Sequence, residues 1–194
     1  MENQTFDQDL LIRTHNLDLH TVRPSDYELL AVNRADPTLW IDRGFTNPLG
    51  HLVADPGPLP HRIPRILADP SLAKYLLRLA VYRPEQVIIG SAGFHMAPNP
   101  EGMIEIGLGI EPAYRGRGFA QELLHGMWGW VVQDPQIKTL RYTVSPTNLP
   151  SQAIIAKLGF TFVGQQIDEE DGPEDIFEMS ADDYRVKFGG ANQP

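Results

Sequence analysis

Residues 103–131 have the sequence MIEIGLGIEPAYRGRGFAQELLHGMWGWV, and the rest of the chain is organised around them. Isoleucine and leucine alternate with other residues over Met103–Ile110, which predicts a β-strand whose apolar side chains share one face. Pro112 cannot donate to a strand ladder, so we expect the strand to end before it. The apolar residues of 123–131 then recur at helical spacing. The stretch therefore predicts a strand, a glycine-rich turn and a helix.

The turn between these two elements, Tyr114-Arg115-Gly116-Arg117-Gly118-Phe119-Ala120, has the features of an anion-binding site. The first N–H groups of a helix have no intrahelical partner and lie at the positive end of the helix dipole. Glycine at positions 116 and 118 allows the backbone to approach a ligand closely, and the two arginines add positive charge. A diphosphate is the expected ligand.

Two common phosphate-binding signatures do not match here. G-x-G-x-x-G fails from Gly107 because Pro112 occupies its third glycine position, and G-x-x-x-x-G-K-[ST] fails because no lysine follows these glycines. The residues Arg115-x-x-Gly118-x-Ala120 instead match the R/Q-x-x-G-x-G/A signature of the Gcn5-related N-acetyltransferases (GNAT family). The alternative interpretation is an arginine-rich turn on a solvated surface.

A second motif lies downstream of the turn. Asn148-x-x-Ser151 followed by Lys157-Leu158-Gly159-Phe160 resembles the family pattern N-x-x-S/A ending in K-x-G-F. With serine at position 151, the motif resembles that of the branch that acetylates the N-termini of ribosomal proteins (RimJ/RimL type). Other branches use a tyrosine seven residues after the asparagine as general acid, and this chain has Ile155 there.

The resemblance covers nearly the whole chain and implies an α/β (α+β) fold in a single domain. The family's sheet is mixed and mostly antiparallel, is flanked by helices, and holds acetyl-CoA in a splayed pair of strands. Outside 103–131 we expect these elements: a strand over 11–22 broken near Asn16, a helix from Pro24, a short helix ending at 65–68, a hairpin of strands 76–82 and 87–96, a strand over 137–144, a helix capped by Asn148 and ended by Gly159, and a hairpin of strands 162–167 and 175–179. Residues 1–10 are expected to be a disordered N-terminus, 11–188 the acetyltransferase domain, and 189–194 a frayed tail.

Prolines and glycines crowd residues 36–64 and are expected to break any long element there. A loop this long in a compact domain is usually functional or mobile. It carries apolar and aromatic residues that a solvated loop does not need: Trp40, Phe45, Leu49, His51 and Leu52. We expect it to form one wall of the acceptor pocket, and a floppy insertion is the alternative.

Acetyl transfer to an amine has three chemical needs: a base for the amine, a donor for the thioester oxygen, and a proton for the departing thiolate. Glu105 is the candidate base, because it shares a strand face with Gly107 and Gly109, which leave an open slot beside it. A solvated carboxylate is the other interpretation. Ser151 is the candidate proton donor, or else a hydroxyl that caps helix amides.

The resemblance implies that acetyl-CoA is the cosubstrate and that three groups of residues contact it. Backbone amides of Leu108, Gly109 and Ile110 contact the carbonyl and pantetheine, the turn residues Arg115, Gly116, Arg117, Gly118, Phe119 and Ala120 hold the pyrophosphate, and Asn148 and Ser151 lie along the arm. Phe94, His95, Tyr142 and Trp40 are candidates for the acceptor side, or simply for core packing.

Composition limits the classes of function. The chain has no cysteine, which excludes disulfides, thiolate metal sites and an acyl-cysteine intermediate. A formal net charge of −9 argues against nucleic acid and mildly favours a cationic acceptor; the alternative is that an acidic surface only keeps the protein in solution. No two of the six histidines fall at i, i+4 on an expected helix, so we expect no metal site. The acidic start of the chain and the absence of a long apolar run predict a cytoplasmic protein with no membrane partner.

The leading hypothesis is an acetyl-CoA-dependent N-acetyltransferase that modifies a primary amine, on a protein N-terminus or a small molecule, by direct attack in a ternary complex. The rival is a CoA-binding sensor or partner-binding module of the same fold. The sequence leaves open the acceptor, the length of the acyl group, and whether the chain forms a homodimer.

Overall fold

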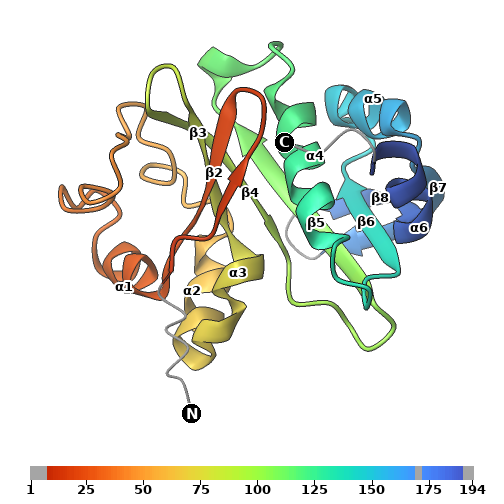
Figure 1. The fold of residues 1–194 in the computed structure, drawn as a ribbon, viewed down its shortest axis with the longest axis horizontal. Coiled ribbons are helices and arrows are strands. Elements are labelled where there is room, and N and C mark those ends of the chain that lie inside the picture. Colours follow the sequence, from red (N-terminus) through yellow and green to blue (C-terminus); the bar gives the residue numbers. More distant parts are fainter. Residues whose placement is uncertain (1–7, 169–171, 190–194) are drawn as a thin grey trace. The chain divides into compact units, whose positions relative to one another are not determined.

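The structure is a computed structural model that describes residues 8–168 and 172–189 (Figure 1). In chain order the elements are β1 (Leu11–Arg13), β2 (Leu17–Thr21), α1 (Pro24–Val32), α2 (Leu59–Ala68), the 3₁₀ turn η1 (Pro70–Leu72), α3 (Ala73–Leu76), β3 (Arg78–Tyr82), β4 (Val87–Phe94), β5 (Met103–Ile110), the 3₁₀ turn η2 (Pro112–Tyr114), α4 (Phe119–Val131), β6 (Thr139–Val144), α5 (Leu149–Leu158), β7 (Thr161–Asp168), β8 (Gly172–Ser180) and α6 (Ala181–Phe188). The eight strands follow the order β1-β2-β3-β4-β5-β6-β8-β7. Strands β5 and β6 pair in parallel. The pairs β1–β2, β2–β3, β3–β4, β6–β8 and β7–β8 are antiparallel. This confirms the predicted α/β class with a mostly antiparallel sheet.

The chain divides into two compact units, which we describe separately. The first comprises residues up to 93 together with 108–126, and the second comprises 94–107 together with 127 onward. The predicted strand and helix of 103–131 are confirmed, as is the hairpin of β3 and β4. The predicted boundaries at 10 and 189 remain predictions, and residues 1–7 and 190–194 lie outside the described part.

The first unit opens with a hairpin, drawn in red in Figure 1, where the sequence predicted one interrupted strand. Leu11 pairs with His20 and Arg13 with Asp18, so β1 and β2 are antiparallel and residues 14–16 form the turn. The carboxylate of Glu122, on α4, accepts hydrogen bonds from the amides of residues 16 and 17. This partner lies more than 100 residues away, which is why local sequence did not reveal the turn.

Helix α2 (Leu59–Ala68) is the short helix expected to end at 65–68, and it starts within the proline- and glycine-rich residues 36–64. It begins at Leu59 and includes two prolines. Pro60 falls in the first turn, where its missing N–H has no intrahelical partner to lose. Pro64 removes one helical hydrogen bond, and the helix continues because Leu59, Arg62 and Ile66 are buried along one side.

The rest of the loop, residues 36–58, packs into the core of the first unit. Trp40, Phe45 and Leu52 are buried among side chains of β3, β4 and helices α1–α3. Trp40 and Leu52 have φ angles of 69° and 62°, in the left-handed region that bulky residues rarely adopt. The segment 34–53 also lines a surface hollow of about 380 Å³. The loop is therefore a packed structure, and its role as an acceptor wall remains a prediction.

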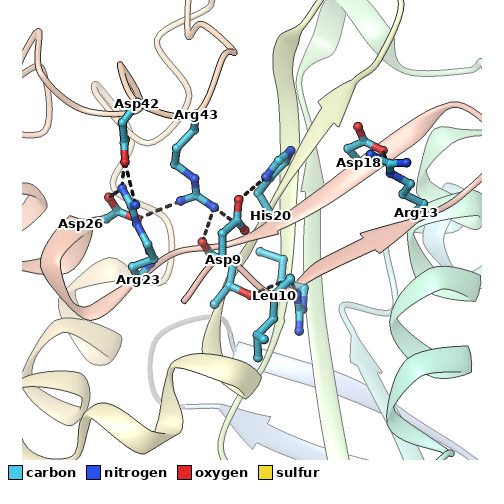
Figure 2. Close-up of polar contacts among 11 residues, drawn as sticks. Asp9, Leu10, Arg13, Asp18, His20, Arg23, Asp26, Asp42 and Arg43 are labelled. Atoms are coloured by element: carbon cyan, nitrogen blue, oxygen red, sulfur yellow. Dashed lines mark hydrogen bonds and ion pairs between the residues drawn. The ribbon is translucent and has the colours of Figure 1, made fainter. Parts of the chain in front are cut away.

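An ion network with a buried pair at its centre ties this loop to α1 and to the N-terminal segment (Figure 2). Arg43, whose side chain is only 2% exposed, pairs with Asp26 at 2.9 Å and with Asp9 at 2.6 Å. Arg23 joins Asp26 to Asp42 at 3.0 and 2.8 Å. Asp9 belongs to the segment expected to be disordered, yet it is held by this network.

The second unit contains β6, β7, β8 and the helices α5 and α6. The predicted caps of α5 are confirmed: the Asn148 side chain accepts from the amide of Ser151, and Gly159 ends the helix with φ 89°. The predicted closing hairpin is confirmed as β7 and β8. Helix α6, capped by Ser180, was not predicted, because its mostly polar sequence shows only Ala181 and Tyr184 as buried positions.

Candidate active site

The glycine-rich turn in the first unit has the geometry that the sequence predicted for an anion site. Gly116 and Gly118 have φ angles of 74° and 85°, so both positions require glycine-like backbone freedom. The first helical bond here runs from the N–H of Glu122 to the carbonyl of Gly118. The amides of residues 119–121 precede that bond and lie at the positive end of α4, where an anion would be stabilised.

The two arginines of the turn are held in different ways. The Nε–H of Arg115 donates to the carbonyl of Ile110 at 2.7 Å, which fastens the turn to the end of β5. The guanidinium of Arg117 lies 4.9–5.2 Å from the ring centres of Tyr82, Tyr114 and Phe119. Aromatic faces attract a cation without neutralising it, so this cage keeps positive charge beside the amides. The cage could not be predicted from the sequence, because Tyr82 comes from the distant strand β3.

The three predicted amide donors of β5, at residues 108–110, do not all point to the same side of the strand. The N–H of Glu111 donates to the carbonyl of Ile89 on β4. Because N–H directions alternate along a strand, the N–H groups of Ile110 and Leu108 point away from β4, and that of Gly109 points toward it. This favours Leu108 and Ile110 over Gly109 as donors to a ligand.

Glu105 lies in the second unit and has specific neighbours. Its side chain is 16% exposed, and its Oε1 accepts a hydrogen bond from Thr143 Oγ1 at 2.5 Å. His95 Nδ1 lies 3.6 Å from the same oxygen, beyond hydrogen-bond length but within ion-pair range. A Cβ at Gly107 would lie 3.2 Å from His95 Nε2, so glycine leaves space beside this group. The carboxylate is thus oriented by partners rather than freely solvated.

Sequence reasoning missed Thr143. Strand β6 pairs in parallel with β5 from Met103–Thr139 to Ile106–Tyr142, with Glu105 beside Arg141. Thr143 follows two residues later on the same face of β6, which brings its hydroxyl to Glu105. The alternation on β6 was visible in the sequence, but the pairing register was not.

At the start of α5 the two predicted residues have distinct roles. Asn148 caps the helix by accepting from the Ser151 amide at 3.2 Å. The Ser151 side chain is hydrogen-bonded to the phenol of Tyr142. Burial raises the pKa of Tyr142, and the bond with Ser151 partly opposes that rise. Ser151 therefore connects to a second hydroxyl that could resupply a proton.

The structure thus assembles the predicted site residues in two sets. Within the first unit it brings together residues 108–110 and 115–120, and within the second it holds Glu105, Asn148 and Ser151. Of the candidates for the acceptor side, Trp40 and Phe94 are core residues: Phe94 packs on Trp128. Among the helices of the described residues, none has the length and apolar character needed to cross a membrane.

Comparison with known proteins supplies independent information. Residues 16–161 match the family model described as an acetyltransferase (GNAT) domain. The uncharacterized N-acetyltransferase YjdG of Bacillus subtilis (strain 168) is 29% identical over 82 residues, which is 42% of this chain. The match spans about half (49%) of that relative's length.

Solved structures agree at the level of the fold. The ribosomal-protein-S5-alanine acetyltransferase from Vibrio fischeri has a TM-score of 0.63 at 16% identity, covering 91% of this chain and 99% of that one. RimL, a ribosomal L7/L12 alpha-N-protein acetyltransferase solved with coenzyme A, has a TM-score of 0.61 at 15% identity, covering 88% and 98%. At these identities the likeness concerns the fold alone.

Proposed function

The chain belongs to the acetyltransferase (GNAT) family and is thereby an acyltransferase; on this premise we propose that it transfers the acetyl group of acetyl-CoA to a primary amine. The observation that carries the proposal is the turn of residues 115–120. It combines two left-handed glycines, amides at the start of α4 that have no partner within the helix, and a caged arginine, all within the region matched by the family model.

Acetyl-CoA is the cosubstrate in this proposal, and the residues present fit its chemistry. A pyrophosphate is bound by backbone amides and positive charge, which the turn offers. The N–H groups of Leu108 and Ile110, which point away from β4, serve the thioester carbonyl and the pantetheine arm. RimL, which shares the fold, was solved with coenzyme A, and this supports the choice of ligand.

The transfer itself is a direct attack in a ternary complex. The carboxylate of Glu105 takes the proton of the acceptor ammonium, directly or through a water molecule. The freed lone pair attacks the thioester carbon, and backbone N–H groups of β5 stabilise the charge that gathers on the carbonyl oxygen. Ser151 gives a proton to the departing thiolate and is reprotonated from Tyr142.

The acceptor class is a finer proposal. Two proteins of the same fold carry names that specify ribosomal proteins as substrates. Together with Ser151 in the second motif, this favours a protein N-terminus over a small amine. The net charge of −9 adds a preference for a cationic acceptor.

An amine screen tests the function. The protein is given acetyl-CoA with N-terminal peptides, polyamines, amino acids or aminoglycosides, and release of the CoA thiol is followed. Turnover with one class, lost in Glu105→Gln, supports the proposal. Tight binding of acetyl-CoA by calorimetry with no turnover on any class would instead identify a CoA-binding module.

A further inference from the structure

The first unit holds a second constellation of reactive side chains that the proposed transfer does not use. Ser91 lies on β4, His51 in the loop of residues 36–58, and Glu111 directly after β5. The Nε2 atom of His51 is 2.9 Å from Ser91 Oγ, and its Nδ1 atom is 2.5 Å from Glu111 Oε1. A hydroxyl, an imidazole and a carboxylate therefore form one continuous chain of hydrogen bonds.

The chemistry of the three groups fixes the direction of these bonds. An ionised carboxylate only accepts hydrogen bonds, so a neutral His51 carries its proton on Nδ1 and donates it to Glu111. Its Nε2 lone pair is then left to accept the O–H of Ser91. The serine proton already faces a base, and the base is oriented by a carboxylate. This is the arrangement that activates a serine as a nucleophile.

The imidazole is held in place by more than its two ring contacts. The side chain of Asn47 donates to the carbonyl of His51 at 3.0 Å and accepts from its amide at 2.9 Å. The neighbouring Thr46 is bonded to β4 through the amide of Ile88. On the other side, Leu52 is buried with a left-handed backbone. Such fixed orientation is what a base needs in order to act repeatedly on one hydroxyl.

The surroundings of Ser91 select a small substrate. Ser91 is only 5% exposed, so a bulky group cannot reach it. Its neighbours on β4 are Gly90 and Ala92, and a Cβ at Gly90 would lie 2.3 Å from the carbonyl oxygen of Gly109. Gly109 itself is exposed. The backbones of β4 and β5 therefore approach closely beside Ser91, which leaves access only to a small group.

We propose that Ser91, His51 and Glu111 form an acyl-transfer triad that cleaves short acyl thioesters and activated esters without an amine. Ser91 Oγ bonds to the acyl carbon while its proton passes to His51 Nε2. The carbon–sulfur or carbon–oxygen bond of the substrate breaks, and the leaving group takes that proton. Water, activated in turn by His51, then hydrolyses the acyl-serine to a carboxylic acid and restores Ser91. Glu111 is the positioning residue that holds the imidazole.

The test uses the full chain with p-nitrophenyl acetate, and separately with acetyl-CoA, in the absence of any amine. Intact mass and peptide mapping after a rapid acid quench are expected to show one acetyl group on Ser91. Ser91→Ala is expected to lower ester cleavage about 10²-fold or more, within the range of acid–base catalysis. Ser71→Ala, at a partly exposed serine bonded to Asp69, is the matched control and should keep the wild-type rate.

Two further variants separate catalysis from structure. Glu111→Gln should lower kcat for the ester with little change in KM, which a merely structural contact would not do. Because the chain has no cysteine, S91C introduces a single thiol, and a small alkylating reagent should modify it in the folded protein. Acetylation at other residues only, an undiminished rate in Ser91→Ala, or a thiol that reacts only after denaturation would each overturn the proposal. Because no amine is present, such failure leaves the amine acetyltransferase proposal untouched.

Discussion

Replacing Arg43 with methionine tests whether this ion network, with its buried Arg43–Asp26 pair, stabilises the first unit. Figure 2 shows the guanidinium between Asp26 and Asp9, and its Nη2 also donates to the carbonyl of Thr21 at 2.7 Å. Methionine keeps much of the side-chain length and removes the charge. Asp26 is only 4% exposed, so water cannot replace the guanidinium as a partner for its carboxylate.

The expected cost follows from these contacts. Removing one partner of a buried ion pair typically destabilises a protein by about 3–5 kcal/mol, because the other charge stays buried. Arg23 still faces Asp26, and His20 still faces Asp9, which places the expected value toward the lower end of that range. For a chain of this size the change corresponds to a fall in Tm of roughly 6–20 °C.

Arg13→Ala provides the control in the same region. Arg13 pairs with Asp18 at 3.8 Å, and its side chain is 74% exposed. Such surface pairs contribute about 0–1 kcal/mol, so this variant should unfold nearly as the wild type does.

Urea unfolding followed by circular dichroism measures both variants. A loss in Arg43→Met no larger than that in Arg13→Ala would refute the reasoning. Buried and exposed ion pairs would then contribute equally, and the network would not stabilise the fold.

Four further predictions concern the site and its pH dependence. Gly118→Asp should weaken acetyl-CoA binding about tenfold or more by calorimetry through charge repulsion; Gly118→Ala shares the backbone strain but not the charge, and equal losses would assign the effect to strain. Glu105→Gln should lower kcat at neutral pH about 10²-fold, with a loss that shrinks as the amine deprotonates at higher pH; a loss independent of pH would indicate positioning. Ser151→Ala should lower kcat with little change in the KM for acetyl-CoA. A lower Tm with unchanged kcat would instead show that the role of Ser151 is structural. Burial raises the pKa of Asp9, but His20 and Arg43 lower it by more, from 3.8 to about 2. Its ionised form therefore stabilises the fold above about pH 4, and this contribution disappears as the pH falls from about 4 to 2. The difference in unfolding free energy between Asp9→Asn and the wild type should vanish over the same interval.

Local patterns in the sequence predicted the elements that local physics determines. Alternation over 103–110 and the glycines at 116 and 118 needed no distant partner, and the structure has the strand and the turn where expected. The caps of α5 were predictable for the same reason, since Asn148 and Gly159 act on backbone groups within a few residues of themselves.

The remaining features depend on pairs of residues that are distant in the sequence. Glu122 fixes a turn more than 100 residues before it, and Thr143 reaches Glu105 only through the register of β5 and β6. His51 is 40 residues from Ser91 and 60 from Glu111. A histidine in a loop gives no periodic signal, so its partners could be identified only from the folded chain.

The loop of residues 36–58 shows what composition alone leaves open. Its many prolines and glycines were compatible with a floppy insertion, and its aromatic residues predicted a wall of the acceptor pocket, which remains a prediction. In the structure, Trp40 and Leu52 are buried in left-handed conformations that cost of order 1–3 kcal/mol each. Such strain persists only where the surroundings determine the backbone strongly, which here means the apolar core and the Arg43 network. The loop is therefore fixed, and His51, the residue before Leu52, is presented to Ser91 and Glu111 in one orientation, as reactive chemistry requires.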